Sequence, residues 1–193
     1  MTEPGLLDVR RVLGDRPPKE LPDHDQWAAV AMLLRDMGSG PEVFFIRRAE
    51  HPRDPWSGHM AFPGGRQQTD DASLLATAVR ETREEVGFDL SSDAEPIGQL
   101  DDLQAIARGK PQETVIRPFV FDVRHSPPVR VDHREVAEAL WTPLLPLYRG
   151  EVDTVRPYDW RGKRIDFPAY DVGGRVVWGL TYQMLRSFFR ILG

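Results

Sequence analysis

The chain contains no cysteine among its 193 residues. Disulfides, thiolate metal sites and thiol nucleophiles are therefore excluded together, although the redox compartment is left open. Long apolar runs are also lacking, since no segment approaches the roughly 20 residues that a membrane-spanning helix needs. Residues 1–5 form neither the basic region nor the apolar core of a secretion signal. We therefore expect a cytoplasmic protein that does not cross a membrane.

Basic residues are outnumbered, because Lys and Arg together number 25 against 30 Asp and Glu, for a formal net charge of −5. Binding of nucleic acid through its phosphates needs a clustered basic surface, so nucleic acid is not an expected partner. A small phosphorylated ligand suits this charge if divalent cations lie between carboxylates and phosphates. Serine-hydrolase elbows, Gly-x-Gly-x-x-Gly fingerprints and phosphate loops are absent as well, so phosphate chemistry has to come from carboxylates.

The length favours one domain with one core, preceded by a short extension. Residues 1–26 are this expected extension, with an amphipathic helix over 6–13 and a Pro-rich connector over 17–22. Residues 27–193 are the expected main domain.

The pattern of apolar residues and turn residues predicts the elements of that domain. Two strands over 27–34 and 43–46 are joined by a hairpin loop. Two loops are expected, an irregular one over 54–65 and a polar, mobile one near the ligand over 101–114. A strand over 115–123, with Pro118 at an edge or bulge, is followed by a short helix or turns over 132–140. The chain then forms a Gly-Gly hairpin over 171–177 and a closing helix over 178–192. The interleaving predicts an α/β fold with a mixed sheet covered by helices.

A central helix is predicted from an N-cap within residues 69–71 to Gly87, which suits the left-handed end position. Its apolar side chains share one side, while Glu81, Glu84 and Glu85 occupy an adjacent arc. Carboxylates near a helix C-terminus face the negative end of its dipole, at roughly 0.3 to 1 kcal/mol each, and these three also repel one another. A bound cation would turn both penalties into attraction.

Glutamate oxygens are hard ligands that suit Mg²⁺ or Mn²⁺ while leaving positions open for water and phosphate. Gly65, just before the helix, lets the backbone approach such a site closely. Arg80 precedes Glu84 by four residues and can orient its carboxylate. The competing explanation is an exposed acidic helix whose charges only solvate it.

The motif Arg-Glu-x-x-Glu-Glu-x-Gly over residues 80–87, preceded by Phe-Pro-Gly-Gly over 62–65, resembles the signature of the Nudix hydrolases. Roughly residues 27–190 also resemble the coenzyme A pyrophosphatase branch of that family. The segments that carry this second resemblance are Arg-Arg-Ala at 47–49, the glycine loop at 58–65, Arg-Pro-Phe-Val at 117–120, the stretch 135–144 and Trp-Gly-Leu-Thr at 178–181.

The resemblance implies an α/β/α sandwich that hydrolyses a small-molecule diphosphate with Mg²⁺ or Mn²⁺. Glu81 and Glu85 match the principal metal-binding glutamates, Glu84 matches the remaining one, and the Gly65 carbonyl is a further ligand. Arg80 is the orienting partner of these catalytic carboxylates. The general base stays open between a carboxylate, a metal-bound water and a later acidic residue such as Glu135.

Some positions depart from the family pattern. The spacing before Arg80 is one residue longer, so the acidic partner there is Asp70 or Asp71. Ile46, Ala49-Glu50 and Asp54 replace the Thr, Ser-Ala and Arg that the coenzyme A branch carries upstream. Coenzyme A or an acyl derivative is the leading substrate. Another nucleoside diphosphate derivative, such as ADP-ribose, a dinucleotide or a damaged nucleotide, is the second candidate, and a nucleotide-binding module without turnover is the third.

Several residues outside the helix are candidates for substrate binding. Arg47 and Arg48 alternate faces at a strand end, so one of them can reach a phosphate. His59 suits a phosphate or a structural hydrogen bond, and Trp56 suits stacking on a base or closure of its loop. Further candidates are Glu135 on the substrate side and Gln112 and Glu113 as additional metal ligands. A homodimer is left as a possible assembly.

Overall fold

The computed structural model describes residues 3–52, 54, 56–107, 110–125, 127–160 and 162–193. The helices are α1 (Leu6–Asp15), α2 (Leu74–Val86), α3 (Leu90–Asp93), α4 (Leu144–Tyr148) and α5 (Gly179–Leu192). The strands are β1 (Gln26–Asp36), β2 (Pro41–Arg48), β3 (Met60–Ala61), β4 (Gly64–Arg66), β5 (Ala94–Gln99), β6 (Leu103–Ala107), β7 (Lys110–Val123), β8 (Val136–Pro143), β9 (Asp153–Trp160), β10 (Lys163–Val172) and β11 (Arg175–Trp178). None of these helices has both the length and the apolar character of a membrane span.

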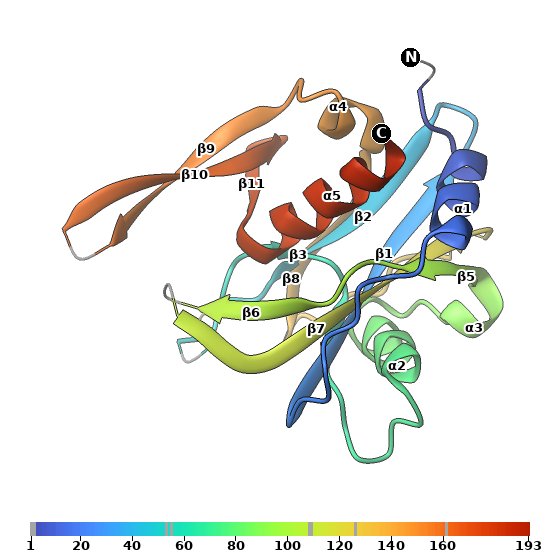
Figure 1. The fold of residues 1–193 in the computed structure, drawn as a ribbon, viewed down its shortest axis with the longest axis horizontal. Helices are drawn as coiled ribbons and strands as arrows, with labels where there is room; N and C mark the ends of the chain where they lie inside the picture. Colours follow the sequence, from blue (N-terminus) through green and yellow to red (C-terminus); the bar gives the residue numbers. More distant parts are fainter. Residues whose placement is uncertain (1–2, 53, 55, 108–109, 126, 161) are drawn as a thin grey trace.

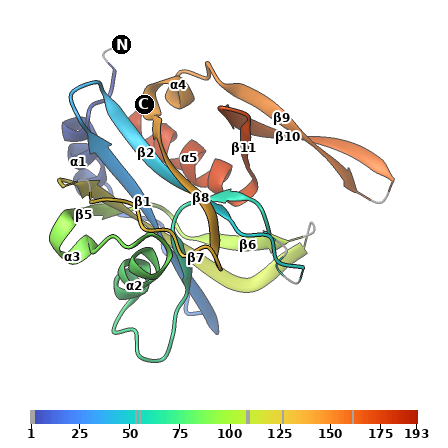
Figure 2. The same ribbon diagram turned by 180° about the vertical axis from the view of Figure 1, so that it is seen from behind.

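The main sheet runs in the order β3-β2-β1-β7-β5, with β4 added to β1, β6 to β7 and β8 to β2. The β1–β7 pair is parallel and the other pairs are antiparallel, so the sheet is mixed. Strand β1 alternates between two cores: Met32 and Leu34 join α1 and α5, whereas Ala31 and Leu33 join α2. Helices therefore cover both faces, as Figures 1 and 2 show. The predicted α/β/α sandwich is confirmed.

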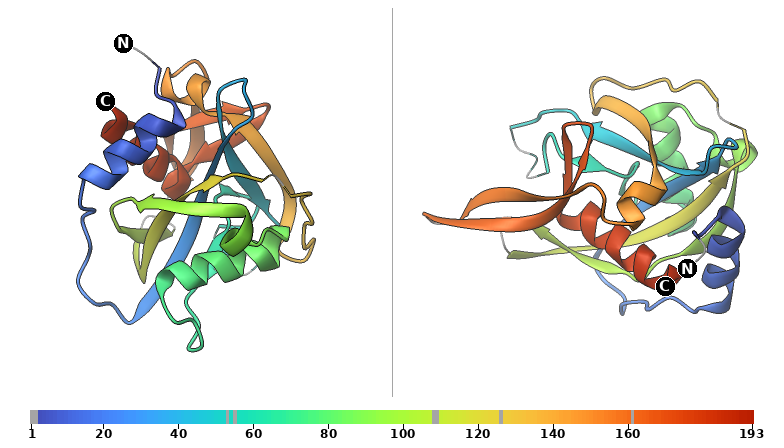
Figure 3. Two further views of the ribbon diagram at one scale, coloured as in Figure 1. Left: turned by 90° about the vertical axis from the view of Figure 1, so that its right-hand side faces the viewer. Right: turned by 90° about the horizontal axis from the view of Figure 1, so that it is seen from above.

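A smaller antiparallel sheet, in the order β11-β10-β9, follows the main one. Its β10–β11 turn has positive φ at Gly173 and Gly174 (58° and 83°), as a two-residue hairpin turn requires, so the Gly-Gly prediction is confirmed. Strands β9 and β10 form a ribbon that extends away from the body (Figures 1 and 3). This ribbon was not predicted from the sequence.

The central helix α2 begins two to four residues later than predicted. Its N-cap is Ser73, whose hydroxyl accepts the Ala76 N–H at 3.1 Å, and not a residue within 69–71. Asp71 is engaged elsewhere, because its carboxylate binds Arg80. The other end is confirmed, since Gly87 has φ 77° and its N–H donates to the Arg83 carbonyl.

Four other predictions about local structure are wrong in whole or in part. The short helix or turns expected over 132–140 are a turn at 133–135 followed by strand β8, which pairs antiparallel with β2, a long-range contact that local patterns do not reveal. The loop over 54–65 contains the short strands β3 and β4. The loop over 101–114 is largely β6 and the start of β7, with 108–109 outside the described residues. Strand β7 has partners on both sides, and Pro118 lies where the second partner changes from β5 to β6, so its missing N–H is tolerated away from any edge.

The N-terminal segment belongs to the same body. Val9 and Leu13 of α1 are buried in the core that α5 covers, and the connector donates two backbone N–H groups, from Lys19 and Leu21, to the carboxylates of Asp101 and Asp102. The closing helix is confirmed as α5, with Leu185, Phe188 and Phe189 buried. The domain boundary after residue 26 stays a prediction.

Strand β4 returns onto β1 so closely that a side chain at Gly64 has no room. A Cβ there would lie 2.2 Å from the Ala29 carbonyl oxygen, and φ is 148°. We expect Gly64→Ala to lower the free energy of unfolding by about 3 kcal/mol. Gly38→Ala is the matched control, because Gly38 also has positive φ but open space around it, and about 1 kcal/mol is expected. Urea unfolding that gives equal losses for both variants would contradict this account of the β1–β4 contact.

Candidate active site

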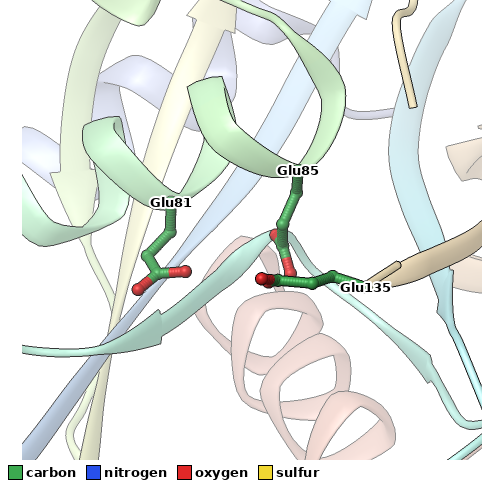
Figure 4. A group of neighbouring side chains, drawn as sticks. All are labelled: Glu81, Glu85 and Glu135. Atoms are coloured by element: carbon green, nitrogen blue, oxygen red, sulfur yellow. The ribbon is translucent and has the colours of Figure 1, made fainter. Parts of the chain in front are cut away.

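Three carboxylates converge below the last turns of α2. Glu81 and Glu85 lie one turn apart on that helix, and Glu135 reaches them from the turn before β8 (Figure 4). One oxygen from each residue lies within 4.8 Å of the other two. Of the residues that the structure describes, only these three form such a group.

The backbone at the end of α2 explains the position of Glu135. The N–H groups of Arg130 and Asp132 each donate, at 2.9 Å, to the carbonyls of Val86 and Glu85. These carbonyls belong to the last turn of α2 and have no partner inside the helix. The turn that follows is closed by a hydrogen bond from the Glu135 N–H to the Asp132 carbonyl. It places the Glu135 carboxylate close to those of Glu81 and Glu85.

Glu85 is the most buried member of the group, with 2% of its surface exposed. Burial raises the pKa of its carboxyl to about 8, the Gly64 N–H that it accepts at 2.8 Å opposes this shift, and the charge of Glu81 adds to it. Burial likewise raises the pKa of Glu81, opposed by Arg80. The site thus gathers hard oxygen ligands in surroundings that disfavour their charge, which fits a divalent cation as their partner.

Gly65 packs directly against Glu81. A Cβ at this position would lie 2.5 Å from the Glu81 carboxyl carbon, so only glycine leaves that side chain where it is. The backbone of Gly65 therefore lies next to the Glu81 carboxylate. Its carbonyl as a ligand stays a prediction.

Arg80 is held by carboxylates on several sides. It donates to Asp71 Oδ1 at 2.9 Å, to Glu81 Oε1 at 2.8 Å and to Glu84 Oε2 at 3.0 Å. Of the two acidic residues considered for this partnership, Asp71 makes the contact, and the guanidinium holds the pKa of Asp71 far below its usual range. Arg80 can therefore fix the orientation of Glu81.

Glu84 does not join the group of three. Its side chain is 56% exposed and contacts Arg80, while Glu135 lies in the place expected for a third ligand. The role of Glu84 as a metal ligand stays a prediction. Glu113 is exposed and accepts from Gln26 at 3.3 Å, away from the group, and the side chain of Gln112 lies outside the described part.

A cavity of about 440 Å³ opens beside the carboxylates. Four of the predicted substrate residues line it: Arg48, Trp56, His59 and Glu135. Arg47 does not, because the alternation of β2 directs it to Glu138, at 3.5 Å. Part of the cavity wall is apolar and includes Val30, Met60, Ile116, Leu180 and Met184.

Two residues in the cavity wall were not among the predicted site residues. The Asp54 carboxylate accepts a hydrogen bond from Arg48 at 2.6 Å, so it binds the guanidinium that was a candidate for contacting a substrate phosphate. The ring of Trp178 lies 4.8 Å from that of His59, and burial together with the charge of Arg156 lowers the pKa of His59. The sequence offered a signal for Asp54, as a departure from the family pattern, but none for the contact between rings distant along the chain.

The comparisons with known proteins agree with this geometry. The family model of the NUDIX domain matches residues 25–161. An uncharacterized protein of Schizosaccharomyces pombe is 40% identical over 118 residues, which are 60% of this chain and 36% of that protein. The peroxisomal coenzyme A diphosphatase ndx-8 of Caenorhabditis elegans is 32% identical over 71% of this chain and 57% of its own length. The chain thus spans between about a third and three fifths of these relatives.

Among solved structures, a MutT/nudix family protein from Enterococcus faecalis matches the fold with a TM-score of 0.57 at 15% identity, over 100% of this chain and 76% of the other. The chain belongs to the Nudix hydrolase family, whose members act on small-molecule diphosphates and need divalent metal ions. The predicted family is confirmed, and the predicted class of enzyme, a diphosphate hydrolase, is the class that this family defines.

Proposed function

We propose that the chain hydrolyses the diphosphate of coenzyme A or acyl-coenzyme A to adenosine 3′,5′-bisphosphate and 4′-phosphopantetheine. One observation carries the proposal: a single cavity combines the convergent carboxylates with an apolar wall, as a diphosphate joined to a long flexible arm requires. The named activity of the Caenorhabditis elegans relative supports the same substrate.

Mg²⁺ or Mn²⁺ would be held by Glu81, Glu85 and Glu135, with Glu84 and the Gly65 carbonyl as further candidate ligands. Such an ion supplies charge neutralisation of the diphosphate and an activated water. Arg80 keeps Glu81 in place, and Arg48 can move from Asp54 to a substrate phosphate, since both anions suit its guanidinium. The general base stays open between a water and a carboxylate such as Glu135.

A second candidate substrate is another nucleoside diphosphate derivative, such as ADP-ribose, a dinucleotide or a damaged nucleotide. Asp54 favours this candidate. It stands at the position where the coenzyme A branch has an arginine, and its carboxylate binds Arg48, so two cations that could contact coenzyme A are replaced or engaged. A binding module without turnover has less support, because three repelling carboxylates around one point have no role in it.

A panel of diphosphate compounds tests the proposal. The purified chain is incubated with coenzyme A, acetyl-coenzyme A, ADP-ribose and a dinucleotide, with Mg²⁺ or Mn²⁺ and with chelator, and the products are identified by mass. We expect coenzyme A to be cut at its diphosphate only when metal is present. Turnover confined to the other compounds would support the second candidate, and no turnover by the folded, metal-loaded protein would support the module.

Other proposals concern the setting of the protein. A cytoplasmic location, the possible homodimer and the lack of a nucleic-acid partner are kept as predictions. The Caenorhabditis elegans relative is named as a peroxisomal protein, and that location is not transferred to this chain. Fluorescent tagging in cells and sedimentation in solution test the location and the assembly separately.

A further inference from the structure

The ribbon of β9 and β10 has one face that is rich in aromatic and cationic side chains. The register pairs Arg156 with Phe167 and Tyr158 with Ile165, and residues directly opposite in antiparallel strands share a face. These side chains remain accessible, with Phe167 37% and Ile165 39% exposed. We call the surface formed by these four residues and Trp178 the aromatic face.

The aromatic face continues into the cavity that holds the carboxylates. Trp178 of β11 pairs with Ala169 of β10, which places it on the same side of the sheet as Phe167. Its ring centroid lies 5.9 Å from those of Phe167 and Tyr158 and 4.8 Å from that of His59. Since both Trp178 and His59 line the cavity, one ligand can touch the carboxylates and the ribbon at the same time.

The two faces of the ribbon differ in the neighbours of their cations. Arg156 lies on the aromatic face, with its guanidinium carbon 5.9 Å from the Trp178 ring centroid, and strand alternation places Lys163 on that face as well. Asp159 and Asp166 fall on the opposite face by the same alternation, together with Arg164, which contacts Asp166 at 3.3 Å, so Arg156 and Lys163 do not share a face with these two carboxylates. A surface that offers aromatic rings beside cations suits a planar base that carries a phosphate.

The ribbon is less suited to a second copy of the chain. Strand β9 is the edge of its sheet, and Pro157 in its middle lacks the N–H that an added strand would need. The cations on the aromatic face would also meet the same cations of a symmetric partner. A phosphorylated nucleoside brings the opposite charge.

We propose that the aromatic face binds the 3′-phosphorylated adenosine half of the substrate. The base stacks on Phe167 and Trp178, and the 3′-phosphate meets Arg156 and Lys163. The diphosphate then lies over the carboxylates, and the pantetheine arm lies along the apolar wall of the cavity. This inference rests on the proposed function and adds the residues that select the nucleotide half.

The experiment compares the wild-type chain with Phe167→Ala and Arg156→Ala. Val155→Ala is the matched control, because Val155 is 52% exposed on the other face of the same ribbon. Steady-state kinetics with coenzyme A and Mg²⁺ give KM and kcat, and calorimetry gives the affinity for adenosine 3′,5′-bisphosphate and for adenosine 5′-monophosphate. Thermal unfolding verifies that each variant is folded.

We expect Phe167→Ala to raise KM about tenfold and to weaken the bisphosphate to a similar degree, with kcat nearly unchanged, because one stacking ring is lost. Arg156→Ala should weaken the bisphosphate more than the monophosphate, since only the former carries the 3′-phosphate. Val155→Ala should match the wild type in KM, in kcat and in both nucleotide affinities.

Different failures point to different conclusions. Coenzyme A turnover with unchanged KM in both variants would overturn the inference and leave the proposed function intact. A wild-type chain that binds the bisphosphate through Phe167 but does not cut coenzyme A would overturn the proposed function and leave the nucleotide site standing. A dimer that Phe167→Ala converts to a monomer, with unchanged nucleotide affinity, would assign the aromatic face to a second copy and also overturn the inference.

Discussion

Glu85→Gln is expected to lower turnover by about 10³-fold, because an amide is a poor metal ligand and several kcal/mol of transition-state stabilisation are lost with the metal. The fold should persist, since the amide oxygen can still accept the Gly64 N–H that Glu85 accepts at 2.8 Å. The measurement is kcat/KM on the substrate that the panel identifies, with circular dichroism to verify folding.

Glu84→Gln is the comparison for this variant. It makes the same chemical change one residue earlier, at a side chain that is 56% exposed and lies outside the carboxylate group. The structure predicts a smaller loss for it than for Glu85→Gln. Equal losses would return Glu84 to the metal ligands, and wild-type activity of Glu85→Gln would remove Glu85 from them.

The stability of the metal-free protein should fall as the pH rises from 5 to 8. Burial raises the pKa of Glu85 from its ordinary value of 4.5 to about 8 in the folded protein, so over this range the folded chain keeps a proton that the unfolded chain releases. The free energy of unfolding is therefore greatest below the pKa that Glu85 has in the unfolded chain, and it decreases as the pH approaches the pKa in the folded chain. The expected decrease between pH 5 and pH 8 is up to about 4 kcal/mol. Chemical unfolding at a series of pH values in chelator measures this slope.

Two further measurements isolate the contribution of Glu85. His59 acts in the opposite direction, because its lowered pKa makes the folded state weaker at acid pH, so the wild type has to be compared with Glu85→Gln at each pH. We expect the variant to be the more stable of the two at pH 8 without metal. Mg²⁺ should raise the wild-type Tm more at pH 8 than at pH 6, since ligands bind metal deprotonated, and a pH-independent shift would contradict this.

The sequence was sufficient for those parts of the fold that local chemistry determines. The period of α2, the left-handed Gly87 and the Gly173-Gly174 turn are set by residues close to each other along the chain, and each was predicted correctly. Strand β8 was misread because its conformation depends on pairing with β2, about a hundred residues away. The β9–β10 ribbon was missed for a related reason, since most of β10 is exposed and its conformation depends on pairing with β9 and not on burial in the core.

The same distinction applies to the candidate site. Helical spacing predicted that Glu81 and Glu85 lie together, but it also included Glu84, which lies outside the group, and Glu135 entered only as a general candidate because fifty residues separate it from Glu85. Which of Arg47 and Arg48 faces the cavity depended on the strand register, which the sequence left open. The salt bridge of Arg48 with Asp54 required the shape of the intervening loop, and no pattern encodes it.

The hydrogen bonds that tie Arg130 and Asp132 to the end of α2 involve only main-chain atoms. These two contacts do not depend on which side chains residues 130 and 132 carry, whereas two others do: Val131 packs against the core that α2 covers, and the Asp132 carboxylate accepts the Arg134 N–H at 3.0 Å. The main-chain contacts fix where the turn to Glu135 starts. Inserting one residue between Asp132 and Glu135 should therefore move the third carboxylate away from Glu81 and Glu85.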